Sequence, residues 1–142
     1  MNKEEREYFF IQQEESLLKG GASLSEWCTF MSKSVYVAFV NGADLATIIT
    51  VMACIETYFK TEELSMQKKN LAFLIDKYPF LGEKGKENLH MLRKYRNRWV
   101  HIDCIDDTPV LKNEDIFIDE VQRMACLSIE MLLTVLFSHP YI

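Results

Sequence analysis

The spacing of the apolar residues constrains this chain more than any other feature of its sequence. Between residues 24 and 39, apolar side chains recur every three or four positions, which is the repeat of one face of an α-helix. These residues are Leu24, Trp27, Cys28, Met31, Val35, Ala38 and Phe39. The 142 residues include only 5 Gly and 3 Pro, too few for a β-sandwich built from many hairpins. The sequence therefore predicts an all-α protein with long helices.

Turn and capping residues divide the chain into five or six predicted helices. Breaks are expected at Gly20-Gly21, at Asn41-Gly42 and in the loop Asp106-Asp107-Thr108-Pro109, and Ser23 with Glu26 three residues later predicts a capping box. The predicted helical segments are residues 3–18, 23–40, 43–60, 64–77, 83–103 and 119–138. We expect an up-and-down helical bundle in a single domain that covers residues 1–142, with the helix in residues 1–20 at its periphery.

Charge and cysteine usage predict a cytoplasmic protein with reduced thiols. The formal net charge is -5, and acidic residues fill the N-terminus, where a signal peptide needs a basic and then an apolar start. The longest apolar runs are too short to span a membrane. The four cysteines lie far apart, without Cys-x-x-Cys spacing or a completing set of histidines, so no metal site is expected. No Walker loop or similar motif is present, and no cofactor is expected.

Two charged residues stand on the apolar faces of predicted helices. Glu56 lies four residues after Met52 and three before Phe59 on the apolar stripe of segment 43–60, and Arg96 lies among the apolar residues of segment 83–103. An ionised side chain is almost never buried unless it is paired. We therefore expect Glu56 and Arg96 to form an ion pair between the two helices. This pair would either fix the register of the helices or hold Arg96 ready for an anionic ligand.

The segment from Arg93 to Asp103 contains the motif Arg96-Asn97-x-x-x-His101. The motif resembles the signature of the HEPN superfamily (higher eukaryotes and prokaryotes nucleotide-binding domains). Its members are small α-helical bundles, and many are metal-independent endoribonucleases in toxin–antitoxin, abortive-infection and CRISPR-associated systems. As in many members, the motif falls on a late helix and an earlier helix carries an inward acidic residue, here Glu56. The resemblance implies an endoribonuclease in a toxin or phage-defence role that leaves a 2′,3′-cyclic phosphate.

The resemblance also implies a role for each motif residue. His101 acts as general base or acid, Arg96 binds the scissile phosphate and stabilises the transition state, and Asn97 orients the imidazole or the phosphate. Glu56 would position Arg96. The residue types suit this chemistry, because imidazole titrates near neutral pH and guanidinium offers a planar, permanently charged fork to developing phosphate charge.

Geometry and charge predict how RNA would be bound. Arg96 and His101 are five residues apart, about 140° around an ideal helix, so they do not share one face. A groove between two protomers would bring them together, and the resemblance implies a homodimer whose paired motifs face one another. Residues 84–98 contain six basic residues against one acidic residue, and Arg93, Lys94 and Arg98 are the expected RNA contacts. An antitoxin or another defence protein is the further partner that the resemblance implies.

Other interpretations of the same residues remain open on the sequence. The chain is alternatively a non-catalytic HEPN-like module for RNA binding, protein binding or dimerisation, or a plain helical scaffold in which the Glu56–Arg96 bridge is structural. His90 lies on the polar stripe of segment 83–103 and is either an RNA contact or a surface histidine. Tyr95 and Trp99 either stack on bases or belong to the core.

Overall fold

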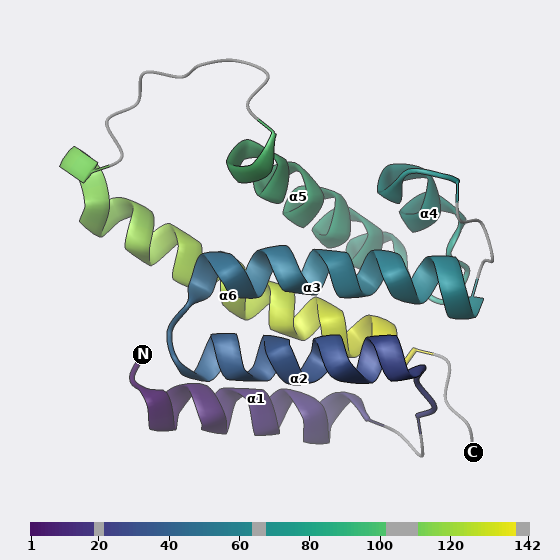
Figure 1. Cartoon of the computed structure of the whole chain (residues 1–142), viewed down its shortest axis with the longest axis horizontal. Helices are drawn as coiled ribbons and strands as arrows, with labels where there is room; N and C mark the ends of the chain where they lie inside the picture. The colour runs from purple at the N-terminus through teal and green to yellow at the C-terminus, as the bar shows by residue number, and fades with distance from the viewer. Residues whose placement is uncertain (19–21, 64–67, 102–110, 139–142) are drawn as a thin grey trace.

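The computed structural model describes residues 1–18, 22–63, 68–101 and 111–138. Within these ranges it contains six α-helices and no β-strand, so the prediction of an all-α bundle is confirmed (Figure 1). The helices are α1 (Lys3–Leu17), α2 (Glu26–Val40), α3 (Asp44–Tyr58), α4 (Leu71–Lys77), α5 (Glu83–Val100) and α6 (Glu114–Leu136). A π-helical turn, Phe59–Glu63, continues α3, and a short 3-10 turn, Leu111–Asn113, precedes α6.

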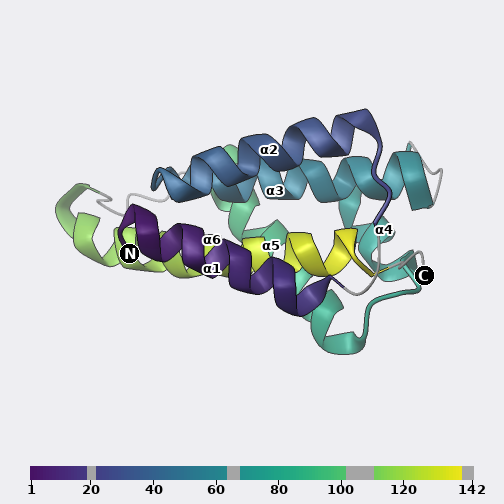
Figure 2. The same ribbon diagram turned by 90° about the horizontal axis from the view of Figure 1, so that it is seen from below.

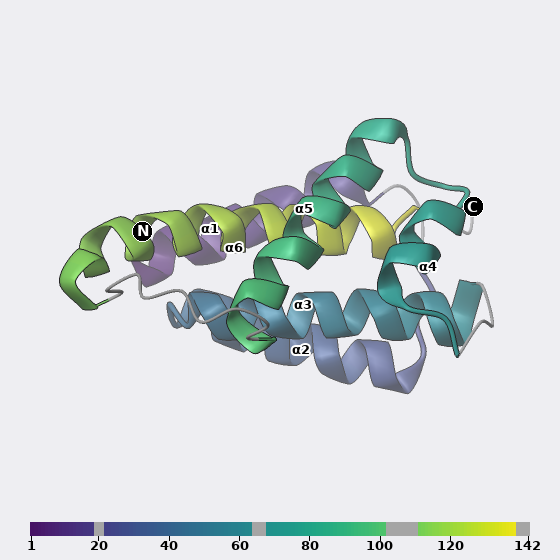
Figure 3. The same ribbon diagram turned by 90° about the horizontal axis from the view of Figure 1, so that it is seen from above.

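The long helices form two layers, and α5 crosses them. Figure 2 shows α2 and α3 in one layer and α1 and α6 in the other. Helix α5 lies across α3 and α6, and α4 packs beside α5 (Figure 3). Helix α3 packs against α2, α5 and α6 and supplies much of the core. The largest fully buried apolar side chains include Phe39, Ile48, Met52, Ile55, Leu89, Leu92, Ile129 and Leu132.

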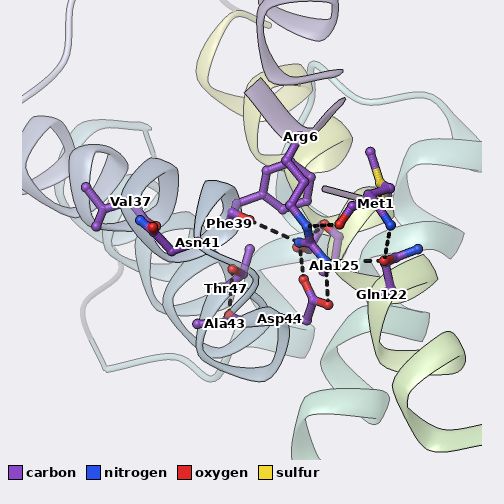
Figure 4. Close-up of polar contacts among 12 residues, drawn as sticks. Met1, Arg6, Val37, Phe39, Asn41, Ala43, Asp44, Thr47, Gln122 and Ala125 are labelled. Atoms are coloured by element: carbon purple, nitrogen blue, oxygen red, sulfur yellow. Dashed lines mark hydrogen bonds and ion pairs between the residues drawn. The ribbon is translucent and has the colours of Figure 1, made fainter. Parts of the chain in front are cut away.

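A buried ion pair fixes α1 to the rest of the bundle (Figure 4). Helix α1 is rich in charged residues, and only Arg6 and Phe10 are buried along it. The Arg6 guanidinium donates to both carboxylate oxygens of Asp44, at 2.5 and 3.0 Å, and to the carbonyl of Phe39 at 3.0 Å. The side chains of Arg6 and Asp44 are only 6% and 12% exposed. Nothing in the apolar pattern of the sequence singles out this pair.

Helices α2 and α6 begin at residues other than those predicted. The N-cap of α2 is Ser25, whose hydroxyl accepts the amide N–H of Cys28, so the predicted capping box of Ser23 and Glu26 is wrong. Serine occurs at both positions, and the one that starts the helix is the one whose oxygen reaches a free amide. Helix α6 begins at Glu114, five residues before the predicted Asp119. Its first turn begins with Glu114 and Asp115, and the following Ile116 and Ile118 are exposed, so the buried apolar repeat starts only later in the helix.

Helix α4 is shorter than its predicted segment. It begins at Leu71, where the Asn70 side chain caps it by accepting the amide N–H of Phe73 at 2.9 Å. Residues 68 and 69 form a turn and a bend rather than helix. The predicted positions 64–67, Gly20-Gly21, Asp103 and the loop 106–109 lie outside the described residues.

The predicted apolar face of α2 is only partly buried. Cys28, Val35 and Phe39 are fully buried, but Trp27 is 73% exposed and its neighbour Phe30 is 74% exposed. Trp27 precedes Cys28 by one residue, which turns it about 100° away from the core. The prediction that Trp27 belongs to the core face is therefore wrong. Within the described part of the chain, no helix combines the length and apolarity that crossing a bilayer requires.

Candidate functional site

The end of α5 sets the position of His101. Helix α5 ends at Val100, and His101 is its C-cap, with extended backbone angles φ -125° and ψ 103°. The amide N–H of His101 still donates to the carbonyl of Asn97 at 2.9 Å. The prediction that the helix continues to residue 103 is therefore wrong at His101. Since His101 lies beyond the last helical residue, the angle of an ideal helix does not separate its exposed side chain from Arg96.

The Asn97 side chain holds the guanidinium of Arg96. Its side-chain oxygen accepts two hydrogen bonds from Arg96, at 3.1 Å from Nε and 2.9 Å from one terminal nitrogen. The charged donor strengthens both bonds and holds the plane of the guanidinium. The backbone carbonyl of the same Asn97 accepts the amide of His101. The Asn97 side chain thus holds Arg96, whereas His101 is joined to Asn97 by the ordinary backbone bond of the last helical turn.

The predicted ion pair between Glu56 and Arg96 is not formed. Glu56 is half-buried and forms its ion pair with Lys60, one helical turn later, at 3.6 Å. The C-terminal end of α5 lies over the first half of α3, whereas Glu56 belongs to the last turn of α3 (Figure 3). The spacing of apolar residues predicted that both charges lie on inward faces of their helices. Such spacing carries no information about where along their axes two helices cross.

Arg96 lies at the edge of the core rather than at its centre. The buried residues of α5 are Leu89, Leu92 and Tyr95, and Arg96 follows the last of these by one residue. Arg96 is half-buried, so part of its side chain faces solvent. Leu89 and Leu92 lie on the predicted apolar face, but Tyr95 is buried beside them and Val100 is exposed, so the centre of the buried face is displaced from Arg96. This position leaves the guanidinium available to a ligand without the cost of a fully buried charge.

Tyr95 and Trp99 belong to the packed interior between α5 and α6. The Tyr95 hydroxyl donates to Glu120 of α6 at 3.1 Å, and burial raises the pKa of Tyr95. The half-buried Trp99 ring packs edge-on against Tyr95 and Phe117, with ring centroids 6.4 and 6.1 Å away. Of the two interpretations offered for these rings, core packing is the one that the structure supports. They hold the end of α5 against α6 and so support the motif.

The predicted RNA contacts surround the last turns of α5. Lys94 and Arg98 are exposed, and Arg98 lies over the ring of Tyr95 at 5.6 Å from its centroid. Arg93 is half-buried, and its Nε donates to Nδ1 of His90 at 3.4 Å. The last carbonyls of a helix carry partial negative charge, which repels phosphate. Arg96 and Arg98 in the final turns offset that charge.

One polar contact was not predicted at all. Nε2 of His90 lies 2.8 Å from a carboxylate oxygen of Asp76, the exposed residue near the end of α4. The hydrogen bond from His90 is the main reason that the pKa of Asp76 lies below its ordinary value, with the charges of Lys86 and Arg93 adding to the effect. The two residues are separated by a turn, so no helical spacing in the sequence relates them.

The end of α5 presents a half-buried guanidinium, which can bind an anion, and an exposed imidazole. Among the residues that the structure describes, no group of three or more His, Cys, Asp or Glu side chains could hold a metal ion. Cys28 and Cys54 are buried cysteines, and Cys126 is a half-buried one. No protein-family model, curated protein or solved structure matches this chain. The resemblance to the HEPN superfamily therefore depends on the motif and its setting in a helical bundle.

Proposed function

We propose that this protein is a cytoplasmic, metal-independent endoribonuclease of HEPN type. The observation that supports the proposal is that the Asn97 side-chain oxygen holds the Arg96 guanidinium through two hydrogen bonds, at the end of the helix that His101 caps. Metal-free RNA cleavage requires a fixed cation and an imidazole at the same phosphate, and in this proposal Arg96 and the exposed His101 supply these two groups.

In the proposed reaction, His101 accepts the proton of a ribose 2′-hydroxyl. The 2′-oxygen then forms a bond to phosphorus, and the bond from phosphorus to the 5′-oxygen breaks. The leaving 5′-oxygen takes up a proton from water, and His101 returns its own proton to the solvent, so that the products are a 2′,3′-cyclic phosphate and a 5′-hydroxyl. Arg96 stabilises the charge that gathers on the phosphorane oxygens. Glu56, which is paired with Lys60, has no part in this scheme.

The proposed partners are RNA, a second copy of the chain and a defence-system protein. Arg93, Lys94 and Arg98 would contact the RNA backbone. The exposed His101 leaves the end of α5 open to a second protomer, so that two motifs could face one shared groove. A toxin or phage-defence role, with an antitoxin as partner, completes the proposal.

The test is cleavage of RNA by the purified protein in excess EDTA. We expect the wild type to cleave, and His101→Ala or Arg96→Ala to lose activity by about 100- to 10,000-fold. Arg123→Ala, which removes an exposed arginine from α6, is the matched control and should retain full activity. Cleavage that persists in His101→Ala, or that disappears with chelator, would overturn the mechanism. RNA that binds but stays intact would assign the chain to the non-catalytic modules.

A further inference from the structure

A second cluster of polar side chains lies on α5, N-terminal to the motif. His90 stands between Asp76 of α4, at 2.8 Å, and Arg93, one turn later on α5, at 3.4 Å. Lys86 joins the cluster by donating to the backbone carbonyl of Asp76 at 3.0 Å. Because Arg93 donates to Nδ1, the imidazole carries its proton on Nε2 and donates it to the carboxylate. The cluster thus fixes both the histidine and the arginine on the outer surface of α5.

The charge of the cluster is positive and only partly neutralised. Arg93 forms no ion pair with an acidic side chain among the described residues, since the carboxylate of Asp76 is engaged by His90. Arg93 and Lys94 line a shallow depression of about 630 Å³ together with His90, Met91 and Glu87. Two cations and one carboxylate therefore border it, with an exposed methionine that offers apolar surface. A phosphate with part of a nucleotide is the chemistry that such a lining fits.

The depression and the motif lie along the same stripe of α5. His90 and Asn97 are seven residues apart, or about two turns, and Arg93 lies one turn before Asn97. From His90 to His101 the distance along the axis is about 17 Å at 1.5 Å per residue. Successive phosphates are at least about 3.4 Å apart along a strand, so several phosphodiester groups fit between the two positions.

We infer that the depression at His90 and Arg93 binds a second phosphodiester group of the strand whose scissile bond lies at His101. This inference rests on the proposed function and names its substrate class. The substrate is a single-stranded oligoribonucleotide that contacts α5 over several nucleotides on one side of the cleaved bond. A dinucleotide or a free nucleotide, which cannot reach both positions, is a poor substrate.

The test compares short and long substrates with a fixed cleavage position. The long substrates are random-sequence hexanucleotides made of DNA, with a single ribonucleotide near either end, and the short one is the matching dinucleotide pool. We expect the wild type to cleave one of the two hexanucleotides with a kcat/KM at least about 10-fold above that of the dinucleotide. This ratio is the gain expected from one additional charged contact. Arg93→Gln and His90→Gln should lower that value toward the level of the dinucleotide.

Arg123→Gln is the matched control, because it removes the same charge from an exposed position on α6. A second arm measures binding of a fluorescent hexanucleotide to His101→Ala, which does not cleave. Here Arg93→Gln should weaken binding and reduce the slope of log affinity against log salt by about 0.7, the contribution of one phosphate in a single strand. Equal cleavage of short and long substrates, or equal effects of Arg93→Gln and Arg123→Gln, would overturn the inference. Absence of cleavage by the wild type would overturn the proposed function instead, and the binding arm would still decide the inference.

Discussion

At the scale of single residues, Asn97 does more in this structure than its place in the motif indicates. One side-chain oxygen orients Arg96 through two hydrogen bonds, and the backbone carbonyl fixes the residue that ends the helix. The spacing of the motif could identify the three residues. It could not show that Asn97 holds the guanidinium of Arg96, because that contact depends on the rotamers of the two side chains.

Asn97→Ala tests this positioning role. The loss of two hydrogen bonds frees the guanidinium, and we expect kcat to fall by about 10- to 100-fold with little change in KM. Asn97→Asp should hold Arg96 but bring a negative charge to the phosphate, so KM should rise as well. Single-turnover and steady-state cleavage measure the two effects. Asn88→Ala, at a half-buried asparagine earlier on the same helix, is the control and should cleave normally. A fall in KM alone, or no change in kcat, would contradict the role.

The contact between Asp76 and His90 predicts how the pKa of Asp76 changes when His90 is replaced. The hydrogen bond from His90 lowers the pKa of Asp76 below its ordinary value of 3.8. The ionised carboxylate therefore favours the folded state above that pH, and this contribution disappears as the pH falls through the lowered pKa. We expect His90→Gln to raise the pKa of Asp76 toward 3.8, measured from the carboxyl carbon shift by NMR. In Arg123→Gln the titration should stay where it is in the wild type. If His90→Gln left it unmoved too, the hydrogen bond would not be present in solution.

At the scale of helices, the attachment of α1 to the bundle depends on the ion pair between Arg6 and Asp44, which the composition of α1 does not indicate. Arg6→Met would leave Asp44 buried without its partner, and we expect a loss of about 3–5 kcal/mol in the free energy of unfolding. Adding Asp44→Leu should restore most of it, since no unpaired charge then remains. Denaturant unfolding of the four proteins in this cycle measures the coupling. Arg123→Met, at an exposed site, should cost less than about 0.5 kcal/mol. Losses that simply add would show that the pair is not coupled.

The positions of the helices also show what could be predicted from the sequence and what could not. Apolar periodicity placed α3 and α5 nearly correctly, because their buried residues repeat every three or four positions. It failed at the start of α6, where Glu114 and Asp115 carry no apolar repeat, and at Ser23, where a second serine offered an equally good cap. It also failed for the pairing of Glu56, since the crossing point of α3 and α5 depends on how their side chains pack.

At the scale of the whole molecule, the exposed aromatic residues and the motif occupy different helices. Trp27 and Phe30 lie on the outer side of α2, whereas His101 follows α5, on the far side of α3 from α2 (Figure 1). Two protomers that met through α2 would therefore keep their motifs apart. The shared groove of the proposed function requires them to meet through α5. Which helix forms the interface thus determines whether each site is complete within one chain.

Mixed dimers distinguish these arrangements. Arg96→Ala and His101→Ala are each expected to be inactive, but a mixed dimer would contain one site with an intact arginine from one protomer and an intact histidine from the other. With half of the dimers mixed and one of two sites intact, an exchanged mixture should regain about a quarter of the wild-type activity. Native mass spectrometry would establish that mixed dimers form. If they form and stay inactive, each site uses a single chain. If the double variant Trp27→Ser, Phe30→Ser is monomeric and cleaves as well as the wild type, the dimer interface lies on α2 and the shared groove is excluded.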